Sequence, residues 1–433
     1  MSRVGLWPRP RKPVASLSSP GLGDEHPPMT STEAHQAEAV RPGRDRPLRV
    51  LFAAHAFPRT EDDPVGHFIL GLARALGDQG IQVEVVAPAA PGLAARERIR
   101  GVSVRRYRYA PGRAETLAYH ESMHTRAASP GGAAALAGLL VAGTLAIRRA
   151  AARADLVHAH WWFPGGLQAL AAGRRPLVTT VHGTDVRLAR SRPAAQAVCA
   201  RVLRASAVVT AVSDWLAEAV AGFVPECAGR IRIAPMPVDE TIFTPGDEPR
   251  TGLLFVGRLD EQKALDTALR ALPRLSGRAA ALPLRVVGAG PAEPALRRLA
   301  EELGVAGRVA WEGRLPQAEL AAHYRRAAAL LVPGRDEGLG LVAVEGQLAG
   351  APVVAAASGG LVDVVRDGET GRTFPVGDPA ALARAVDEVV ADPAAAARLA
   401  GAARRSAVDR FGTRSAARAY ADAYADALAT RRG

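Results

Sequence analysis

Cysteine, lysine and aromatic residues are scarce in this chain of 433 residues. The two cysteines, Cys199 and Cys227, are too few for a disulfide framework, and neither has metal-ligand spacing around it, so a reducing compartment fits best. Aromatic residues make up 5% of the chain and hydrophobic residues 48%, which predicts large cores of mostly aliphatic side chains. Lysine occurs only at Lys12 and Lys263, so arginine carries nearly all of the positive charge.

The formal net charge of +12 is not gathered in a dense basic run interleaved with aromatic residues. A nucleic-acid-binding surface needs such a patch or stripe. We therefore expect no nucleic-acid partner. A diffuse attraction for anionic substrates or lipid head groups stays open.

Long apolar runs are also lacking. The segment 131–147 is the one membrane candidate in the sequence, but it is shorter than the ~20 residues of a spanning helix and is rich in alanine, which favours a buried helix. The basic start of the chain has no apolar stretch behind it, so we expect no secretory signal. The expected location is the cytoplasm, with peripheral attachment to the inner face of the membrane as the alternative.

Residues 1–47 are rich in proline, serine, glycine and charge without periodicity, which predicts a disordered N-terminal tail. From residue 48 onward, short apolar runs alternate with helical patterns, which predicts parallel strands covered by helices on both faces. A Pro- and acid-rich stretch at 235–249 interrupts the pattern, which then restarts. The predicted strands lie at 48–54, 83–87, 155–160, 176–181 and 207–211 before this linker, and at 253–257, 284–288, 308–311, 330–333 and 353–356 after it.

The predicted fold class is therefore α/β, with two doubly wound Rossmann-like domains that face a cleft. We place the first domain at 48–240 and the second at 241–410. A final helix within 411–433 carries Tyr420 and Tyr424 on one face, and we expect it to cross back to the first domain. Such folds bind ligands at the carboxyl ends of their strands, so the segments that follow strands are the candidates for chemistry.

The segment 335–345 follows a predicted strand and begins a helix. Its glycines allow backbone to approach a ligand closely, and the free N–H groups of the helix start favour a diphosphate. Glu337 lies before the helix and Glu345 about a turn and a half inside it, so both carboxylates can accept hydrogen bonds from sugar hydroxyls. The alternative is an exposed glutamate and a first-turn charge with no ligand.

The segment 257–263 follows the first strand of the second domain and contains the cations Arg258 and Lys263. Both lie at the carboxyl end of the strand, where a diphosphate would lie, and lysine is rare in this chain. Two fixed cations can neutralise a leaving diphosphate without a metal. The alternative is a solvated charge at a helix start, where a cation is mildly unfavourable.

Two other strand ends of the second domain carry weaker signals. Gly288 and Gly290 follow a strand, and the loop that contains Leu315 can present backbone groups to a base edge. Each of these segments also fits an ordinary turn.

In the first domain, His182 follows a strand and is expected to point into the cleft, although a lone histidine is more often structural. His158, His160, Trp161 and Trp162 gather at the end of another strand. They can form an aromatic platform for the face of a sugar or simply a packed loop.

These motifs, taken together and in this order, resemble the retaining glycosyltransferases of family 4, which have the GT-B fold. The resemblance covers nearly all of residues 48–424. It implies that Arg258 and Lys263 are the diphosphate-binding cations of the family. It also implies that Glu337 and Glu345 form the Glu-x7-Glu motif, in which the first glutamate holds the donor sugar and the second the nucleotide ribose.

The resemblance further implies that His182 contacts the donor sugar near the reacting centre, and that Gly66 belongs to the glycine loop after the first strand. The chain departs from the family pattern at three places. Val65 and Ala264 stand where glycine is usual, and Met236-Pro237 stands where Asn-Gly is usual. The predicted catalytic group is Glu337, His182, Arg258 and Lys263. The predicted donor-binding set is Gly66, Arg258, Lys263, Gly290, Leu315, Glu337, Gly340, Leu341, Val342 and Glu345.

We therefore expect an enzyme, a hexosyltransferase that moves a hexosyl group with retention from a nucleotide diphosphate sugar, UDP-sugar first, to a glycan, lipid-linked or small natural-product acceptor. The nucleotide sugar is a substrate, so neither a cofactor nor a metal is expected. A nicotinamide-dependent oxidoreductase should show Gly-x-Gly-x-x-Gly after a first strand, which is missing, whereas a non-catalytic nucleotide-sugar-binding protein would share the whole fold. The candidate acceptor contacts are His67, Tyr119, His120, Trp161, Trp162 and Arg187.

Overall fold

The computed structural model describes residues 46–61, 63–115, 117–119 and 129–430. Both sheets lie within one compact unit, residues 44–433. The predicted N-terminal tail lies outside the described residues except for its last two positions.

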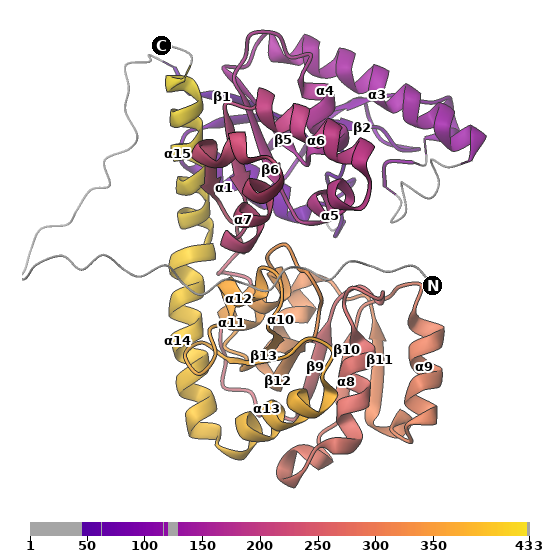
Figure 1. Cartoon of the computed structure of the whole chain (residues 1–433), viewed down its shortest axis with the longest axis vertical. Helices are drawn as coiled ribbons and strands as arrows, with labels where there is room; N and C mark the ends of the chain where they lie inside the picture. Colours follow the sequence, from indigo (N-terminus) through magenta and orange to yellow (C-terminus); the bar gives the residue numbers. More distant parts are fainter. Residues whose placement is uncertain (1–45, 62, 116, 120–128, 431–433) are drawn as a thin grey trace, which may run out of the picture. The chain divides into compact units, whose positions relative to one another are not determined.

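The first sheet has eight strands in the order β3-β4-β2-β1-β5-β6-β7-β8. Figure 1 labels β1, β2, β5 and β6 of this sheet, in indigo to magenta. All neighbouring strands are parallel except β3 and β4, which are antiparallel. The strands are β1 (Arg49–Ala53), β2 (Gln82–Pro88), β3 (Arg96–Ile99), β4 (Val102–Tyr107), β5 (Leu156–His160), β6 (Leu177–Val181), β7 (Val208–Ala211) and β8 (Ile231–Ile233).

The central strands of this sheet are buried on both faces, which explains their uninterrupted apolar sequences. Along β1, Val50 and Phe52 enter one hydrophobic core, whereas Leu51 and Ala53 enter the other. α3 (Pro130–Ala151) contacts β1, β2 and β4, while α15 (Thr413–Ala429) contacts β5, β6 and β7. The predicted doubly wound arrangement is thus present.

The second sheet has six strands, all parallel, in the order β11-β10-β9-β12-β13-β14. Its order reverses between β9 and β12, which are hydrogen-bonded neighbours although two strands separate them in the chain. Loops that follow β9 and β12 therefore meet at the same edge. The strands are β9 (Gly252–Val256), β10 (Leu284–Val287), β11 (Val309–Gly313), β12 (Ala327–Val332), β13 (Val353–Ala356) and β14 (Arg372–Phe374).

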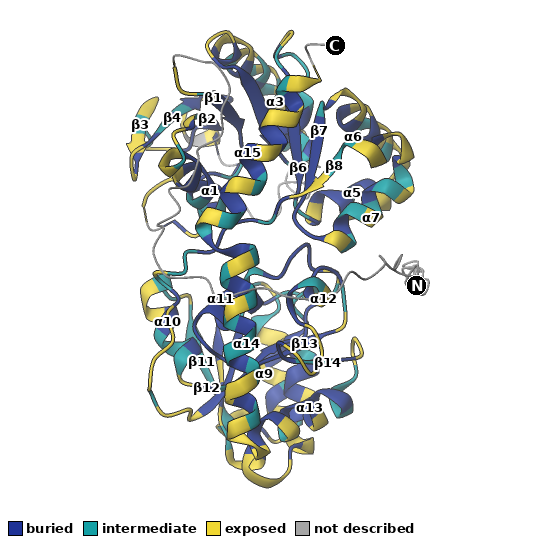
Figure 2. Ribbon diagram, turned by 90° about the vertical axis from the view of Figure 1, so that its left-hand side faces the viewer, coloured by how far each residue is buried: buried dark blue, intermediate teal, exposed yellow. Residues whose placement is uncertain are grey.

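The helices pack their apolar sides on the sheets and expose the opposite sides, as Figure 2 shows by the alternation of dark blue and yellow along them. The other α-helices in the described part of the chain are α1 (His67–Asp78), α4 (Leu167–Ala169), α5 (Thr184–Ser191), α6 (Pro193–Ala205), α7 (Asp214–Phe223), α8 (Leu265–Ala271), α9 (Glu293–Glu302), α10 (Gln317–Arg325), α11 (Leu341–Leu348), α12 (Leu361–Val364), α13 (Pro379–Ala391) and α14 (Pro393–Phe411). Short turns of 3-10 helix lie at Gly112–Ala114, Pro225–Arg230, Leu272–Arg274, Gly277–Ala281 and Ala306–Arg308, and a π-turn lies at Trp162–Gly166.

The chain passes between the two sheets twice, and the two passages are bonded to each other. The Val238 amide of the linker donates to the Phe411 carbonyl over 2.9 Å, at the junction of α14 and α15. Glu240 accepts from the hydroxyl of Thr413. α15 then packs on the first sheet, where its Tyr424 hydroxyl lies 2.8 Å from His158 Nδ1. The final helix therefore docks on the first sheet through its tyrosine face, as its sequence predicts.

α3 corrects the interpretation of 131–147 as a buried helix. Among the described residues it is the one helix long and apolar enough to cross a membrane, yet only 17% of its most apolar window is buried. Leu139 and Ile147 face the core, whereas Val141 and Leu145 are 62% and 45% exposed. The helix is thus apolar on both its packed face and its open face. Composition alone does not show that one apolar face is exposed.

Candidate active site

The loop between β12 and α11 carries the acidic part of the site. Gly340 is the N-cap of α11 with φ 90°, and a Cβ there would lie 2.4 Å from the Leu361 side chain, so glycine is required. No acidic residue lies in the first turn of α11, which leaves its positive end uncompensated. Leu341 and Val342, which begin the helix, are partly exposed. This helix start is therefore suited to an anion, and the anion site stays a prediction.

Lys263 and Glu337, which lie 74 positions apart in the sequence, form an ion pair. Lys263 Nζ donates to Glu337 Oε1 over 2.6 Å, and the Glu337 side chain is 9% exposed. The loops that carry them follow the adjacent strands β9 and β12, and the Arg335 amide also donates to the Gln262 carbonyl over 2.8 Å. Two motifs chosen independently from the sequence thus meet in one centre.

Asp260 organises the cationic loop, a role that the sequence interpretation missed. One oxygen of Asp260 accepts from the backbone N–H of Lys263 over 3.0 Å, and the other accepts from the guanidinium of Arg258. Arg258 is itself exposed. Asp260 thereby fixes the direction of both cations. The available signal was an aspartate three residues before a loop amide, a spacing typical of side-chain caps.

Ala264 has a left-handed backbone, with φ 52° and ψ 40°, at the start of α8. This conformation costs an alanine roughly 1–2 kcal/mol relative to the right-handed one. Glycine is usual at this position in the family. Ala264 therefore keeps the loop geometry at an energetic cost.

Gly288 and Gly290 are needed because their loop packs directly on the cationic loop. A Cβ at Gly288 would lie 1.8 Å from the Gly257 carbonyl oxygen, and one at Gly290 would lie 2.3 Å from that of Leu259. These glycines thus support the backbone around Arg258. Leu315 follows β11, which is the neighbour of β10 in the sheet, and it is partly exposed.

Glu345 is the fifth residue of α11 and is buried, with 6% of its surface exposed. Burial raises the pKa of its carboxyl, an effect offset in part by the Tyr324 hydroxyl, which donates to Glu345 Oε2 over 2.7 Å. His67 and Lys263 are close enough to lower the same pKa. The carboxylate is therefore a buried, hydrogen-bonded group and not a solvated first-turn charge.

His182 lies after β6 in a turn that Asp185 holds. The backbone N–H groups of His182 and Gly183 both donate to Asp185 Oδ1 over 3.0 Å. Asp185 Oδ2 is buried with no hydrogen-bond partner among the described residues, and burial raises the pKa of this carboxyl to about 6. Asp185 is a second functional candidate that the sequence interpretation did not name.

The His182 ring belongs to a cluster of rings at the ends of β1, β5 and β6. Its Nε2 lies 3.3 Å from His160 Nδ1, and its ring centroid lies 4.4 Å from that of Trp161. Burial lowers the pKa of His182 to about 3 and that of His55 to about 4. His182 is therefore neutral at physiological pH and acts as a hydrogen-bonding ring, not as a cation.

The two tryptophans have different roles. Trp161 is partly exposed and adopts a φ of 63°. Such a positive φ is uncommon for residues other than glycine, and where it occurs it is often at functional sites. Phe68, another residue that the sequence interpretation missed, lies 5.5 Å from His182 between ring centroids. Trp162 is 2% exposed and its Nε1 donates to the Asp185 carbonyl. The expectation of a platform built from both tryptophans is therefore wrong for Trp162, which is a core residue.

The other acceptor candidates are spread more widely. Gly66 caps α1 with φ 70°, and His67 begins that helix with its Nδ1 2.9 Å from the Pro64 carbonyl. Arg187 is exposed on α5. Tyr119 is structural, because its hydroxyl bonds to both Arg106 and the Pro88 carbonyl. His120 lies outside the described residues.

Among the described residues, this site coincides neither with a metal cluster nor with the cavity at the other end of the first sheet. Within the described part of the chain, no group of three histidine, cysteine, aspartate or glutamate side chains could hold a metal ion. A cavity of about 980 Å³ lies at the opposite, amino-terminal ends of β1 and β2, and it is lined by none of the predicted site residues. The assignment of the site therefore rests on its side chains.

Comparison with known proteins gives the family. Residues 242–406 match the model described as Glycosyl transferases group 1, and residues 65–241 match the model described as Glycosyltransferase Family 4. A D-inositol 3-phosphate glycosyltransferase from Catenulispora acidiphila is 34% identical over 364 residues, which are 76% of this chain and 82% of that protein. A GDP-mannose-dependent alpha-(1-6)-phosphatidylinositol monomannoside mannosyltransferase from Mycolicibacterium smegmatis is 34% identical over 270 residues, 58% of this chain and 70% of that protein.

Solved structures show the same fold. A sucrose-phosphate synthase from Thermosynechococcus elongatus superposes with a TM-score of 0.75 at 22% identity, covering 89% of this chain and all of that one. HepE from Anabaena, in complex with UDP-glucose, superposes with a TM-score of 0.67 at 18% identity, covering 87% of this chain and 99% of that one. The chain therefore belongs to glycosyltransferase family 4, and it is a glycosyltransferase with the GT-B fold.

Proposed function

We propose that the chain transfers a hexosyl group with retention from a nucleotide diphosphate sugar to an acceptor that contains an inositol phosphate. The contact between Lys263 Nζ and Glu337 Oε1 beside the start of α11 is the observation that supports this proposal most directly. It brings a cation for the diphosphate and a carboxylate for the sugar hydroxyls to one point.

In this proposal, Lys263 and Arg258 stabilise the charge that develops on the diphosphate as its bond to the anomeric carbon breaks. The acceptor oxygen bonds to that carbon on the same face, and the acceptor proton passes to the departing phosphate oxygen. Glu337 holds the sugar hydroxyls, and Glu345 the ribose. His182, neutral because burial lowers its pKa, donates or accepts a hydrogen bond at the sugar without adding charge. We propose that the two cations suffice without a metal.

The acceptor proposal rests on two relatives, whose names contain inositol 3-phosphate and phosphatidylinositol monomannoside. His67 at the start of α1 and the exposed Arg187 on α5 are the residues that we assign to an anionic acceptor. We propose UDP-sugar as the first donor to test, with GDP-mannose as the alternative because one relative is named for it.

The test incubates the full chain with UDP-glucose or GDP-mannose and each of inositol 3-phosphate, phosphatidylinositol and free inositol. Mass spectrometry detects the hexosylated product, and proton NMR gives the configuration of the new bond. We expect one donor to glycosylate a phosphorylated acceptor with retention in the presence of EDTA. Transfer to free inositol at the same rate, or inversion, would contradict the proposal.

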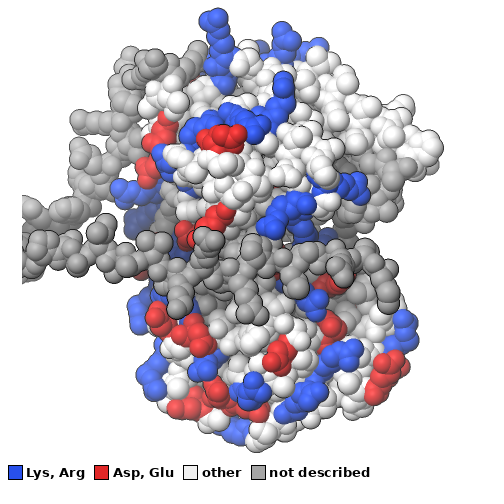
Figure 3. Space-filling view, viewed as in Figure 1, with Lys and Arg blue, Asp and Glu red and all other residues white. Residues whose placement is uncertain are grey.

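We also propose that the protein attaches to the surface of anionic membranes through α3. Its open face carries Ala137, Val141 and Leu145 at intervals of four residues, and the helix has no acidic residue. Arg148 and Arg149 are exposed at its last turn. Figure 3 shows the uncharged area over α3 at the upper right, with basic side chains along the top.

An apolar stripe that ends in arginines fits the boundary between acyl chains and anionic head groups. The other face of α3 packs tightly on its own domain, since a Cβ at Gly143 would lie 2.2 Å from the Gln168 side chain. The helix is therefore proposed to lie on the membrane and not to span it.

Cosedimentation with vesicles tests this attachment. We expect the full chain to bind vesicles that contain phosphatidylglycerol at least about tenfold better than pure phosphatidylcholine vesicles. The double substitution V141D/L145D should abolish binding, whereas V376D, at a similarly exposed valine of the second domain, should not. Equal losses in both variants, or no binding by the parent protein, would contradict the proposal.

A further inference from the structure

The hydroxyl of Ser213, at the start of α7, makes two hydrogen bonds in opposite directions. It accepts from the Leu216 N–H over 3.2 Å, which caps the helix, and it donates to the Gly338 carbonyl over 2.6 Å. Ser213 is only 2% exposed. Capping of a helix needs only the hydroxyl oxygen as an acceptor. The bond that the hydroxyl donates to a carbonyl 125 positions away is therefore an interaction beyond capping.

Gly338 is the residue directly after Glu337, and it is packed between the two domains. A Cβ on Gly338 would lie 2.0 Å from the His182 carbonyl oxygen, and one on Gly183 would lie 2.7 Å from Gly338 Cα. On its other side, the Gly360 amide donates to the Glu337 carbonyl over 2.7 Å. The loop of Glu337 is therefore held from one side by its own domain and from the other by Ser213 and the His182 turn.

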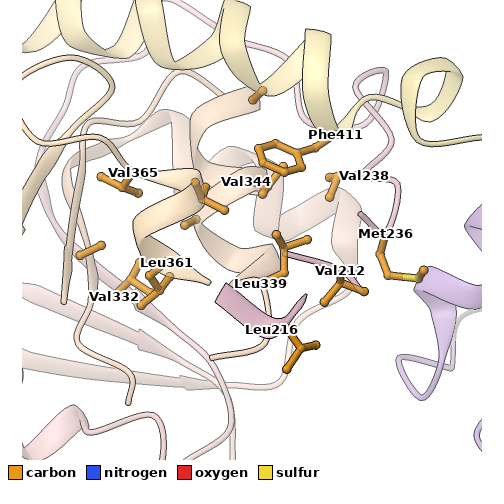
Figure 4. Close-up of a cluster of buried hydrophobic side chains, with 14 of the residues drawn as sticks. Val212, Leu216, Met236, Val238, Val332, Leu339, Val344, Leu361, Val365 and Phe411 are labelled. Carbon is orange, nitrogen blue, oxygen red and sulfur yellow. The ribbon is translucent and has the colours of Figure 1, made fainter. Parts of the chain in front are cut away.

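Apolar contacts surround this hydrogen bond. Figure 4 shows Val212 and Leu216, which flank Ser213, together with Leu339, which follows Gly338, in one buried cluster. Val212 and Leu216 are 3% and 0% exposed, and Leu339 is 5% exposed. A hydrogen bond inside such a cluster is shielded from water, so losing its donor leaves a buried carbonyl unsatisfied.

A second bond ties the same helix start to the second domain. The Trp215 amide donates to Asp363 Oδ2 of α12 over 3.1 Å. The amino-terminal end of α7 is thus bonded both to the Glu337 loop, at Gly338, and to α12, at Asp363.

From these contacts we propose that Ser213 is a positioning residue for transfer: its hydroxyl holds the Glu337 loop against the His182 turn, so that the carboxylate and the imidazole act on the same sugar. The Ser213 hydroxyl is buried and occupied by the Leu216 amide and the Gly338 carbonyl, so we assign it no contact with the donor. Its effect passes through the Gly338 carbonyl to Glu337.

Two substitutions separate this role from helix capping. In Ser213→Asp the carboxylate still caps α7 but cannot donate, and it repels the Gly338 carbonyl. In Ser213→Ala both bonds are lost. Ser213→Thr keeps a hydroxyl and is the conservative rescue. Ser129→Asp makes the same change at the exposed cap of α3, where Ser129 accepts from the Gly132 amide, and serves as the control.

The first readout is amide hydrogen exchange of the full chain without any ligand. We expect exchange at 338–340 to accelerate about tenfold or more in both S213D and S213A. The Leu216 amide should lose protection only in S213A. Unchanged exchange at 338–340 in S213D would overturn the proposal.

The second readout is turnover of UDP-glucose and GDP-mannose, with UDP and GDP binding measured by calorimetry. We expect kcat to fall about tenfold or more in S213D while nucleotide Kd stays within about twofold, and S213T to recover most of kcat. Normal kcat in S213D would overturn the positioning role. If the parent protein turns over neither donor, the proposed donors are wrong, and the exchange comparison still decides the role of Ser213.

Discussion

At the scale of single residues, Glu337 is paired with Lys263, and its carboxylate is nearly buried. We expect Glu337→Ala to abolish transfer, because the sugar hydroxyls lose their acceptor. Free nucleotide should still bind with unchanged or higher affinity, because Lys263 is released for phosphate. Calorimetry with the nucleotide and a transfer assay measure the two effects. Equal losses of nucleotide affinity and of transfer would mean that Glu337 serves the nucleotide.

Ala264 offers a second residue-scale prediction, because its left-handed backbone is better suited to glycine. In Ala264→Gly, relief of roughly 1–2 kcal/mol of strain offsets the loss of one buried methyl group and the added chain entropy, each of about 1 kcal/mol or less. The free energy of unfolding should therefore stay within about 0.5–1 kcal/mol of the parent value.

The control for this substitution is Ala268→Gly in the same helix, where the alanine is equally buried but has an ordinary helical backbone. That change should cost about 2 kcal/mol. Urea denaturation gives both values. Equal costs in the two variants would show that the backbone at Ala264 is not strained.

At the scale of elements, Gly66 sets the position of α1. Gly66 and Gly80 lie at opposite ends of this helix with φ near 70°, but only Gly66 is crowded, since a Cβ there would lie 2.1 Å from the Ala56 carbonyl oxygen. We expect Gly80→Ala to cost about 1 kcal/mol and Gly66→Ala at least about 2 kcal/mol more. Thermal denaturation and the transfer assay compare them. Similar costs would contradict the assigned packing of the loop on α1.

The parts of the site that the sequence predicts are those set by strand ends. Lys263 and Glu337 could each be selected from a local string, and they meet because β9 and β12 are neighbours in the sheet. His160 and His182 meet in the same way through the adjacent strands β5 and β6. Parallel strands align their carboxyl ends, so local motifs suffice to predict a shared site.

The sequence does not reveal contacts that depend on loop conformation or on distant segments. Asp260 and Asp185 act by binding backbone amides in turns, and the short spacing that signals such a contact does not show that the turn belongs to the site. Ser213 resembles any helix cap until its second partner is known. The antiparallel strand β3 was missed because its four residues, Arg96–Ile99, are mostly charged and lie at an edge. Local patterns carry no information about such partners.

At the scale of the whole molecule, buried histidines predict a loss of stability in acid. Burial lowers the pKa of His55, His158, His160 and His182, so between about pH 4 and 6.5 the unfolded chain binds protons that the folded chain does not. Asp185 opposes this trend, since its pKa is raised to about 6 and the folded state binds its proton first.

Among the described residues, five histidines with a lowered pKa, the four named above and His323, outnumber the three carboxyls with a raised pKa, Asp185, Glu345 and Asp363. The net effect is therefore loss of stability as pH falls. We expect the free energy of unfolding to fall by about 1–3 kcal/mol per pH unit between pH 6 and 5. Urea denaturation at pH 7, 6 and 5 measures it, and His158→Gln should reduce the slope. Equal or greater stability at pH 5 would contradict the assignment of neutral buried histidines.

We propose that Lys263 and its neighbours form the site for the diphosphate of a nucleotide-sugar donor. The most direct measurement is calorimetric titration of the full chain with UDP, GDP and ADP in the presence of EDTA. We predict that one nucleotide binds without metal and that Lys263→Ala weakens its binding at least about tenfold, whereas Lys12→Ala, at the other lysine of the chain, leaves it unchanged. Absence of binding by all three nucleotides, or equal affinity in both lysine variants, would contradict the account.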